Sequence, residues 1–294
     1  MSITNLETTD SEYTWLTTTS RGQQLSTSLP KVIRTFEDYA RVDFAIGDND
    51  PVYFAVDKAA QTWGMNWATK FCVGMLSYYH MGTAVRAADL DGEDFWKYLA
   101  SQFATAPRGA ARRHFRGLGG EQTLASMRKF APNPINFFTQ FSTTYAGVKS
   151  VCESQLWGFG PYFWLKIADY MDRCLNMPIR SYDGLGRNLS KVPGKAAKVL
   201  FPETGSEAVS FALACDTLSK LNLHAPPTYN RPVGPAEVET ILCDWLHAKQ
   251  GTNWLGADLI VKRDALKNSG EKGVWMSNWL PPVVKQGTFK LELV

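Results

Sequence analysis

The stretch LWGFGPYFWLKIAD, residues 156–169, places two glycines directly before an amphipathic run. Leu156, Gly158 and Gly160 fit the pattern hydrophobic-x-Gly-hydrophobic-Gly, which is typical of a tight turn between two helices. Glycine tolerates positive φ angles and lets another backbone approach closely, and Pro161 suits the first turn of a following helix. The alternative interpretation of the same residues is a glycine C-cap between two core helices.

A turn of this kind, called a helix-hairpin-helix turn, offers a site for an anion. The N–H groups at the start of the second helix point outward, and the helix dipole favours negative charge there. We therefore predict that this turn binds the backbone of DNA. The predicted DNA contacts are Gly158, Phe159, Gly160, Tyr162, Lys166 and Arg187.

The composition is that of an ordinary globular protein. Of 294 residues, 45% are hydrophobic and 20% are charged, which is enough to build a sizeable core. The net charge of +3 does not by itself identify a nucleic-acid binder. Evidence for nucleic-acid binding must therefore come from basic residues that are clustered in the sequence. The polar, acidic start is unlike a signal peptide, and no apolar run approaches the ~18 residues of a membrane span. The five Cys and four His are scattered, so we expect reduced thiols, no metal and no cofactor.

Apolar residues recur at helical spacing over most of the chain. The predicted helices cover residues 50–64, 66–85, 91–104, 120–131, 161–176, 205–221 and 234–251, with one or two more between 133 and 160. Residues 1–30 are rich in Ser and Thr and indicate a loosely held arm. The stretch 225–235 is rich in proline and indicates a linker, and only the tail TFKLELV alternates like a strand.

These elements predict a mainly α fold with two helical lobes and a short irregular or β tail. The predicted domains are an N-terminal arm (residues 1–34), a helical catalytic domain (35–224) and a C-terminal helical segment and tail (225–294).

The densest charge cluster is APRGAARRHFRGLGG, residues 106–120, with four arginines, a histidine and no acid. If it is helical, Arg108, Arg112 and Arg116 share one face. Like charges so placed repel one another unless an anion lies among them, and the planar fork of arginine binds phosphate oxygens in a bidentate manner. A solvated basic face is the alternative. His114 is a candidate proton donor, because histidine side chains in general can exchange a proton near neutral pH.

The turn and its surroundings resemble the helix-hairpin-helix DNA glycosylases. In that superfamily a Gly-x-Gly turn leads into a helix and then to a catalytic Asp, and Asp183 lies 25 residues after Gly158. Two features differ from the superfamily pattern. Phe163 and Trp164 stand where small residues are usual, and Pro161 and Tyr162 occupy the place of the lysine of the bifunctional enzymes. The resemblance therefore implies a related fold without Schiff-base chemistry.

A closer resemblance covers residues 35–185. The strings DPVYFAVDKAA, YYHMGTAV, FWKYL, PRGAARRHFRG and GFGPYFWLKIADYMDR are together similar to the phage amino acid:DNA transferases of thymidine hypermodification. In that pathway a kinase pyrophosphorylates 5-hydroxymethyluracil in DNA, and the transferase then displaces diphosphate with an amine, commonly that of glycine. The resemblance implies double-stranded DNA with a modified pyrimidine and a free amino acid as partners. We expect a phage-encoded monomer in the host cytoplasm.

The chemistry implied by this resemblance assigns roles to the candidate residues. Departing diphosphate needs a cationic clamp, for which the candidates are Arg108, Arg112, Arg113 and Arg116. The incoming amine must lose a proton, and Asp183 is the first candidate for the base, with Asp169 as the second. Asp169 lies three residues after Lys166, so a surface ion pair between them is the alternative.

Three alternative functions are compared with the sequence by the motifs that each would need. A DNA glycosylase would use the same turn and Asp183 but would leave an abasic site. A kinase of the same pathway should carry the phosphate-binding string GxxxxGK[ST], which is absent from the sequence. A non-catalytic DNA-binding protein of the modification machinery is the third.

Overall fold

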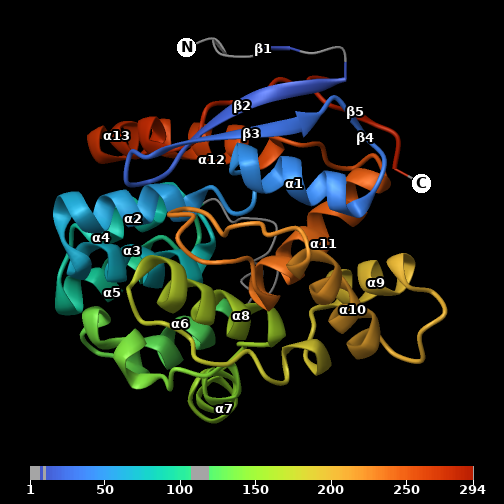
Figure 1. The fold of residues 1–294 in the computed structure, drawn as a ribbon. Coiled ribbons are helices and arrows are strands. Elements are labelled where there is room, and N and C mark those ends of the chain that lie inside the picture. Colours follow the sequence, from blue (N-terminus) through green and yellow to red (C-terminus); the bar gives the residue numbers. More distant parts are fainter. Residues whose placement is uncertain (1–6, 9–10, 107–118, 294) are drawn as a thin grey trace. The chain divides into compact units, whose positions relative to one another are not determined.

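The computed structural model describes residues 7–8, 11–106 and 119–293 of the chain (Figure 1). These residues are mainly helical and include two small sheets, which confirms the predicted mainly α class. They form two compact units, each assembled from separate segments. Unit 1 contains Met1–Ala55, Gly186–Arg263 and Trp279–Val294, and unit 2 contains Val56–Leu185 and Asp264–Asn278. The glycosylase-like arrangement and the domain boundaries after residues 34 and 224 stay predictions.

The sheets of unit 1 contain the first and last strands of the chain. Strands β1 (Glu7–Thr8), β2 (Glu12–Thr18) and β3 (Gln24–Pro30) form an antiparallel sheet, and β4 (Val32–Ile33) pairs in parallel with β5 (Lys290–Leu291). Trp15 and Leu29 are buried on one face of the β2–β3 hairpin. The prediction of a loosely held arm is therefore wrong, because alternate residues of this Ser- and Thr-rich segment supply a buried face.

Four helices form the helical part of unit 1: α1 (Phe36–Ile46), α9 (Lys191–Leu200), α10 (Glu207–Ser219) and α11 (Pro235–Lys249). Thr35 caps α1, since its hydroxyl accepts from Asp38 N at 3.1 Å and Asp38 accepts from Thr35 N at 3.3 Å. Helix α11 packs on α9 and on α1. The Pro-rich stretch 225–235 is no loose linker, because the hydroxyl of Tyr229 donates to the carbonyl of Phe44 at 2.6 Å.

The helices of unit 2 include α8 (Pro161–Asp169), which carries Tyr162, Lys166 and Asp169 of the predicted site. They are α3 (Met65–Tyr78), α4 (Met81–Ala88), α5 (Gly92–Ser101), α6 (Gly119–Phe130), α7 (Tyr145–Gln155) and α8, with the short 3-10 helices η2 (Pro134–Asn136) and η3 (Phe138–Gln140). The unit boundaries fall within α2 (Val52–Trp63), η5 (Leu185–Arg187) and α12 (Ala257–Lys267), and near the end of α13 (Glu271–Trp279).

The single helix predicted over residues 66–85 is in fact two helices. Tyr79 adopts a left-handed conformation with φ of 51° and ends α3, and the imidazole of His80 accepts from Thr83 N at 3.2 Å to begin α4. Helices α3 and α4 pack closely, because a Cβ added at Gly74 would lie 2.9 Å from the Cα of Ala84. His80 is therefore a helix cap.

Two buried cysteines of unit 2 lie against each other. Cys72 on α3 and Cys174 are both buried free thiols joined by a side-chain hydrogen bond. Burial, and then this hydrogen bond, raise the pKa of Cys174 well above its usual range. The thiolate form of Cys174 is thus strongly disfavoured in the folded protein.

Candidate functional site

The predicted turn between two helices is present in unit 2. Helix α7 ends at Gln155, and Leu156 donates its N–H to the carbonyl of Cys152 at 3.0 Å. Gly158 has φ of 79°, a conformation that favours glycine, and Gly160 and Pro161 begin helix α8, which packs on α7. A Cβ added at Gly160 would meet nothing within 4 Å. The backbone at Gly160 is thus open on the side where a ligand backbone would approach.

The aromatic side chains of the hairpin divide into one exposed and several buried residues. Trp157 is 50% exposed, and its backbone N–H donates to the hydroxyl of Ser126 on α6 at 3.1 Å. Phe159 and Trp164 are buried, with the indole N–H of Trp164 donating to the carbonyl of Phe159 at 2.7 Å. Tyr162 is half-buried. The exposed indole of Trp157 is thus the hairpin aromatic that is most accessible to a nucleic acid.

The ion pair of Lys166 and Asp169 is buried, so the interpretation as a surface pair is wrong. The Nζ of Lys166 lies 3.4 Å from Oδ2 of Asp169, and the two side chains are 4% and 0% exposed. Apolar neighbours on α8, such as Leu165 and Ile167, are buried as well, so the helix is enclosed on most of its circumference. The ammonium predicted to contact phosphate is therefore directed at Asp169 in this structure.

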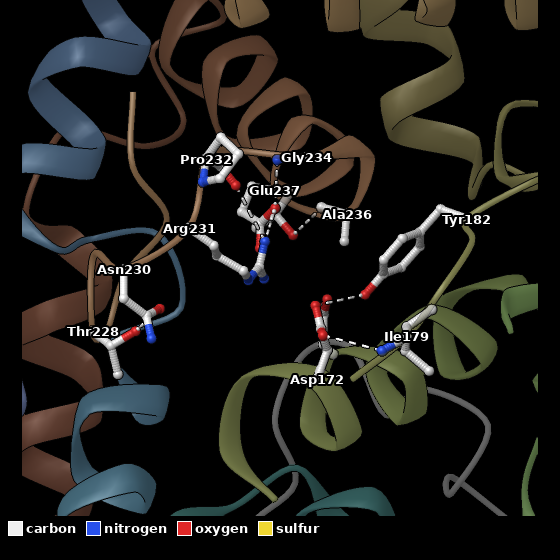
Figure 2. Close-up of polar contacts among 12 residues, drawn as sticks. Asp172, Ile179, Tyr182, Thr228, Asn230, Arg231, Pro232, Gly234, Ala236 and Glu237 are labelled. Carbon is white, nitrogen blue, oxygen red and sulfur yellow. Dashed lines mark hydrogen bonds and ion pairs between the residues drawn. The ribbon is translucent and has the colours of Figure 1, made fainter. Parts of the chain in front are cut away.

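A π-helical segment, η4 (Tyr170–Cys174), continues α8 and presents Asp172. The carboxylate of Asp172 accepts from Ile179 N at 3.1 Å and from the hydroxyl of Tyr182 at 3.4 Å (Figure 2). Such π-helical turns occur frequently at functional sites. The sequence analysis missed Asp172, although its position three residues after Asp169 places the two acids near one face of a helix.

Asp183 follows Tyr182 directly and is exposed. Its N–H donates to the hydroxyl of Ser181 at 3.0 Å. Tyr182 stacks on Tyr145 of α7, with ring centroids 6.4 Å apart. The structure therefore places Asp183 beside a segment that Asp172 and α7 hold in place.

The remaining predicted residues lie in unit 1 or outside the described residues. Arg187 is exposed at the end of η5 (Leu185–Arg187) and belongs to unit 1. The residues Arg108, Arg112, Arg113, His114 and Arg116 lie outside the described residues. Within the described ranges, no group of three or more His, Cys, Asp or Glu side chains is arranged to hold a metal ion. No helix in the same ranges has the length and apolar character needed to cross a membrane.

The described part of unit 2 includes the following two hollows. The first, of about 270 Å³, lies between α5 and α6, the helices on either side of the arginine block, and is lined by Trp96, Ala100, Phe103, Glu121, Leu124, Ala125 and Arg128. The second, of about 500 Å³, lies at the C-terminal ends of α6 and α7 and is lined by Lys129, Phe130, Gln140, Val151, Ser154 and Gln155. The second hollow therefore lies at the end of α7, the helix that leads into the hairpin.

An arginine of unit 1 is held rigidly by a buried acid. The guanidinium of Arg231 donates to both carboxylate oxygens of Glu237, at 2.7 and 3.3 Å, and Glu237 also accepts from Gly234 N at 2.9 Å (Figure 2). Glu237 is fully buried, whereas the side chain of Arg231 is 31% exposed. A bidentate pair of this kind fixes the orientation of the guanidinium. The sequence analysis did not identify this arginine, since its partner lies six residues away across a Pro-rich turn.

Comparison with known proteins identifies relatives over most of the chain. No known protein-family profile matches it. The chain is 30% identical to a putrescinyltransferase of Delftia phage PhiW-14 over 254 residues, which cover 82% of this chain and 81% of the relative. It is 27% identical to a glycinyltransferase of Pseudomonas phage PaMx11, covering 74% of this chain and 85% of the relative. The chain therefore belongs to the phage amino acid:DNA transferase family of thymidine hypermodification, as a transferase that acts on a modified base in DNA.

Proposed function

We propose that this transferase replaces the diphosphate of pyrophosphorylated 5-hydroxymethyluracil in phage DNA with an amine, for which the sequence predicts an amino acid such as glycine. The amine nitrogen forms a bond to the C5 methylene carbon as the bond from that carbon to the diphosphate oxygen breaks. The nitrogen loses one proton, and the electron pair of the broken bond leaves with diphosphate. The product is a thymine with an amino substituent on its methyl carbon.

The similarity to a putrescinyltransferase and a glycinyltransferase over most of the chain carries this proposal. The two names differ in the group transferred, a diamine in one and an amino acid in the other. Putrescine and glycine both contain a primary amino group, which can act as the nucleophile of the proposed transfer. The reaction class is therefore better supported than the identity of the donor.

The proposed roles of the residues follow from their exposure. Asp183 is the exposed acid beside the hairpin and accepts the proton of the amine, whereas Asp169 is enclosed with Lys166 and acts on the site indirectly. Asp172 orients Tyr182 through the hydrogen bond to its hydroxyl. The arginines 108, 112, 113 and 116 bind the departing diphosphate.

The proposal is tested by mass spectrometry of nucleosides after the protein is incubated with pyrophosphorylated hydroxymethyluracil DNA and a mixture of glycine, other amino acids and putrescine. We expect a nucleoside whose mass equals that of thymidine with one amine donor attached, and release of diphosphate. Abasic sites with a free base would instead identify a glycosylase. Unchanged DNA with every amine would overturn the proposal.

In the same assay, Asp183→Asn and Arg112→Ala are expected to slow transfer by at least tenfold. The Asp183 variant should keep its affinity for DNA, because the side chain is assigned to proton transfer and not to the backbone contact. The matched control is Asp94→Asn, an exposed acid on α5. Equal losses of binding and of transfer in Asp183→Asn would show that Asp183 has a structural role.

A further inference from the structure

The hairpin between α7 and α8 holds the backbone of Trp157 in place and leaves its side chain half exposed. Leu156 before it and Phe159 after it are buried. The N–H of Trp157 donates to the hydroxyl of Ser126 on α6 at 3.1 Å, and yet Trp157 is 50% exposed. A single exposed apolar residue needs no functional explanation in itself. The surroundings of Trp157 therefore decide whether its indole has a role.

The anchors of Trp157 connect it to the second hollow, the one of about 500 Å³ at the ends of α6 and α7. Gln155, two residues before Trp157, lines this hollow from α7. Ser126 lies one helical turn before Lys129 and Phe130, which line the hollow from α6. The backbone of Trp157 is thus fixed to both of the helices that form the hollow.

The lining of the second hollow has the chemistry needed to hold a nucleobase, which has apolar faces and an edge of hydrogen-bond donors and acceptors. Phe130 and Val151 are half-buried and offer apolar surface. Gln140, Ser154 and Gln155 are exposed and carry both donors and acceptors. The amide of Gln140 donates to the carbonyl of Phe130 at 2.8 Å, which fixes this side chain at the hollow. The volume of about 500 Å³ lies within the usual range for small-molecule sites.

The charges around the second hollow favour a DNA strand as its occupant. Residues 122–160 contain three basic side chains and one acidic side chain, which are Arg128, Lys129, Lys149 and Glu153. Glu153 is paired with Lys149 at 3.7 Å, and Arg128 is paired with Glu93 of α5 at 2.7 Å. Lys129 is exposed in the lining of the hollow. A cation beside an apolar and amide surface suits the phosphate that adjoins a bound base.

The second hollow and Asp183 lie at opposite ends of α7. Tyr145, the first residue of α7, donates its N–H to the carbonyl of Ser181 at 2.9 Å, and Asp183 donates its N–H to the hydroxyl of Ser181. The hollow is lined instead by Ser154 and Gln155 at the end of the helix. The 11 residues of α7 span about 16 Å. A base in the hollow is therefore a different base from the one that reacts beside Asp183.

We propose that Trp157 stacks on an unpaired base of the DNA and that the second hollow holds this base. This inference rests on the proposed function, since the reaction itself creates the unpaired base. Enzymes that react at a base take it out of the stack, which leaves its partner unpaired and its neighbours unstacked. Stacking on an exposed indole offsets part of the cost of opening the duplex. The hairpin thus binds a base as well as the backbone and helps to keep the reacting nucleotide out of the duplex.

The test compares the binding of two short duplexes to the full chain, one fully paired and one with a single thymine–thymine mismatch. Fluorescence anisotropy at one fixed salt concentration measures both affinities. The wild type is expected to bind the mismatched duplex more tightly, because an unpaired base is then available without opening a pair. Trp157→Ala should weaken binding of the mismatched duplex about tenfold and of the paired duplex much less, whereas Trp157→Phe should keep part of the preference.

Further variants separate stacking from a general effect on DNA binding. Trp275→Ala removes another Trp of unit 2, which is 45% exposed on α13, and should leave both affinities unchanged. Ser154→Phe fills the second hollow and should remove the preference for the mismatch while Trp157 is intact. Its control is Ser219→Phe on α10, because Ser154 and Ser219 are both exposed near the end of a helix and donate to a backbone carbonyl of that helix.

Several outcomes would overturn the inference. They are equal binding of the two duplexes by the wild type, an unchanged preference in Trp157→Ala or in Ser154→Phe, and a loss of preference in Trp275→Ala as large as that in Trp157→Ala. Thermal unfolding checks that each variant is folded. If Ser154→Phe does not fold, the two variants of Trp157 decide, since they change an exposed side chain.

Activity separates this inference from the proposed function. Transfer of an amine by the wild type, together with an unchanged preference in Trp157→Ala, overturns the inference and leaves the proposed function intact. Loss of the preference in Trp157→Ala without transfer of any amine by the wild type overturns the proposed function instead. Transfer by Trp157→Ala with a raised KM for paired, pyrophosphorylated DNA supports both.

Discussion

Asp48 shows how one side chain can link the fold to pH. Its carboxylate caps α12 through Gly256 N and Leu259 N, which favours the charged form. Burial opposes this more strongly, and with the nearby charge of Asp258 it raises the pKa of Asp48 from 3.8 to about 7. The folded state therefore binds a proton at Asp48 more tightly than the unfolded state does.

The expected result is a loss of stability as pH rises. Because the folded pKa of Asp48 is the higher one, its contribution is complete below pH ~4 and disappears as pH approaches 7, with a slope of at most about 1.4 kcal/mol per pH unit. Urea unfolding between pH 4.5 and 7.5 should show a flatter profile for Asp48→Asn than for the wild type. Asp94→Asn on the surface is the control. Parallel profiles for the wild type and Asp48→Asn would contradict the assignment.

Single residues that depend only on local backbone were predictable, whereas those that depend on tertiary partners were not. Gly158 and Pro161 were identified because a tight turn and a helix start restrict the residue type. Asp172 was missed, since the sequence does not show whether an Asp in a helical pattern faces solvent or a distant segment. The burial of Lys166 was missed for the same reason.

At the scale of elements, the hairpin of α7 and α8 contains two glycines with different requirements. Gly158 has a φ of 79°, a conformation that residues with a side chain rarely adopt, so this position favours glycine. Gly160 has a φ of −96°, which other residues also adopt, and it has open space beside it. An alanine is therefore strained at position 158 and tolerated by the fold at position 160. The first glycine supports the hairpin, and the second leaves room for a ligand.

Gly158→Ala is expected to lower the free energy of unfolding by about 1 kcal/mol. Gly160→Ala should change it by less than about 0.5 kcal/mol and yet weaken duplex DNA binding, because the added methyl group would occupy the space of a phosphate. Chemical denaturation and DNA binding at several salt concentrations check both variants. Unchanged DNA affinity in Gly160→Ala would remove the hairpin turn from the DNA interface.

Helices were predicted correctly where the spacing of apolar residues and the residues typical of helix ends indicated the same segment. The predicted helices at 50–64, 205–221 and 234–251 correspond to α2, α10 and α11. The apolar spacing did not predict the end of α3 at Tyr79, because a tyrosine in the left-handed conformation cannot be recognised from the sequence. Helices α12 and α13 were not predicted, since exposed Val261 and Trp275 place apolar residues outside the buried face. Strands β2 and β3 were hidden by their Ser and Thr content.

At the scale of the whole chain, unit 1 joins segments that are far apart in sequence. Strands β4 and β5 pair residues 32–33 with 290–291. Phe289 is buried beside this pair, with its ring centroid 5.7 Å from that of Tyr13 and 6.5 Å from that of Trp15. The C-terminal segment therefore contributes to the core beneath the β2–β3 hairpin.

Phe289→Ala is expected to lower the free energy of unfolding by about 3 kcal/mol, because it removes buried apolar surface and leaves a cavity against the two rings. The measurement is urea or thermal unfolding followed by circular dichroism. Val261→Ala, at a position that is 61% exposed, should change stability by less than about 0.5 kcal/mol. A similar small effect for both variants would show that the segment around Phe289 contributes little to the core.

The sequence did not predict this assembly, because such long-range pairing leaves no local pattern. Asp43, Asp48, Asp244 and Asp258 lie close enough in unit 1 to affect one another electrostatically, but their spacing along the chain gives no pattern that would connect them. The family resemblance over residues 35–185, by contrast, depends on short sequence motifs that occur in a fixed order along the chain and can be recognised without coordinates. The reaction class was therefore available from the sequence, whereas the proximity of these carboxylates and the pairing of Arg231 with Glu237 required coordinates.

The paired thiols of Cys72 and Cys174 provide a natural probe of how often unit 2 opens. Alkylating reagents and disulfides attack the thiolate, and here the thiol is both enclosed and held protonated. Cys174 can then be labelled only when the surrounding helices separate, so the labelling rate reports how often this part of unit 2 opens. Such labelling, followed with and without DNA, would show whether substrate holds this part of the enzyme closed.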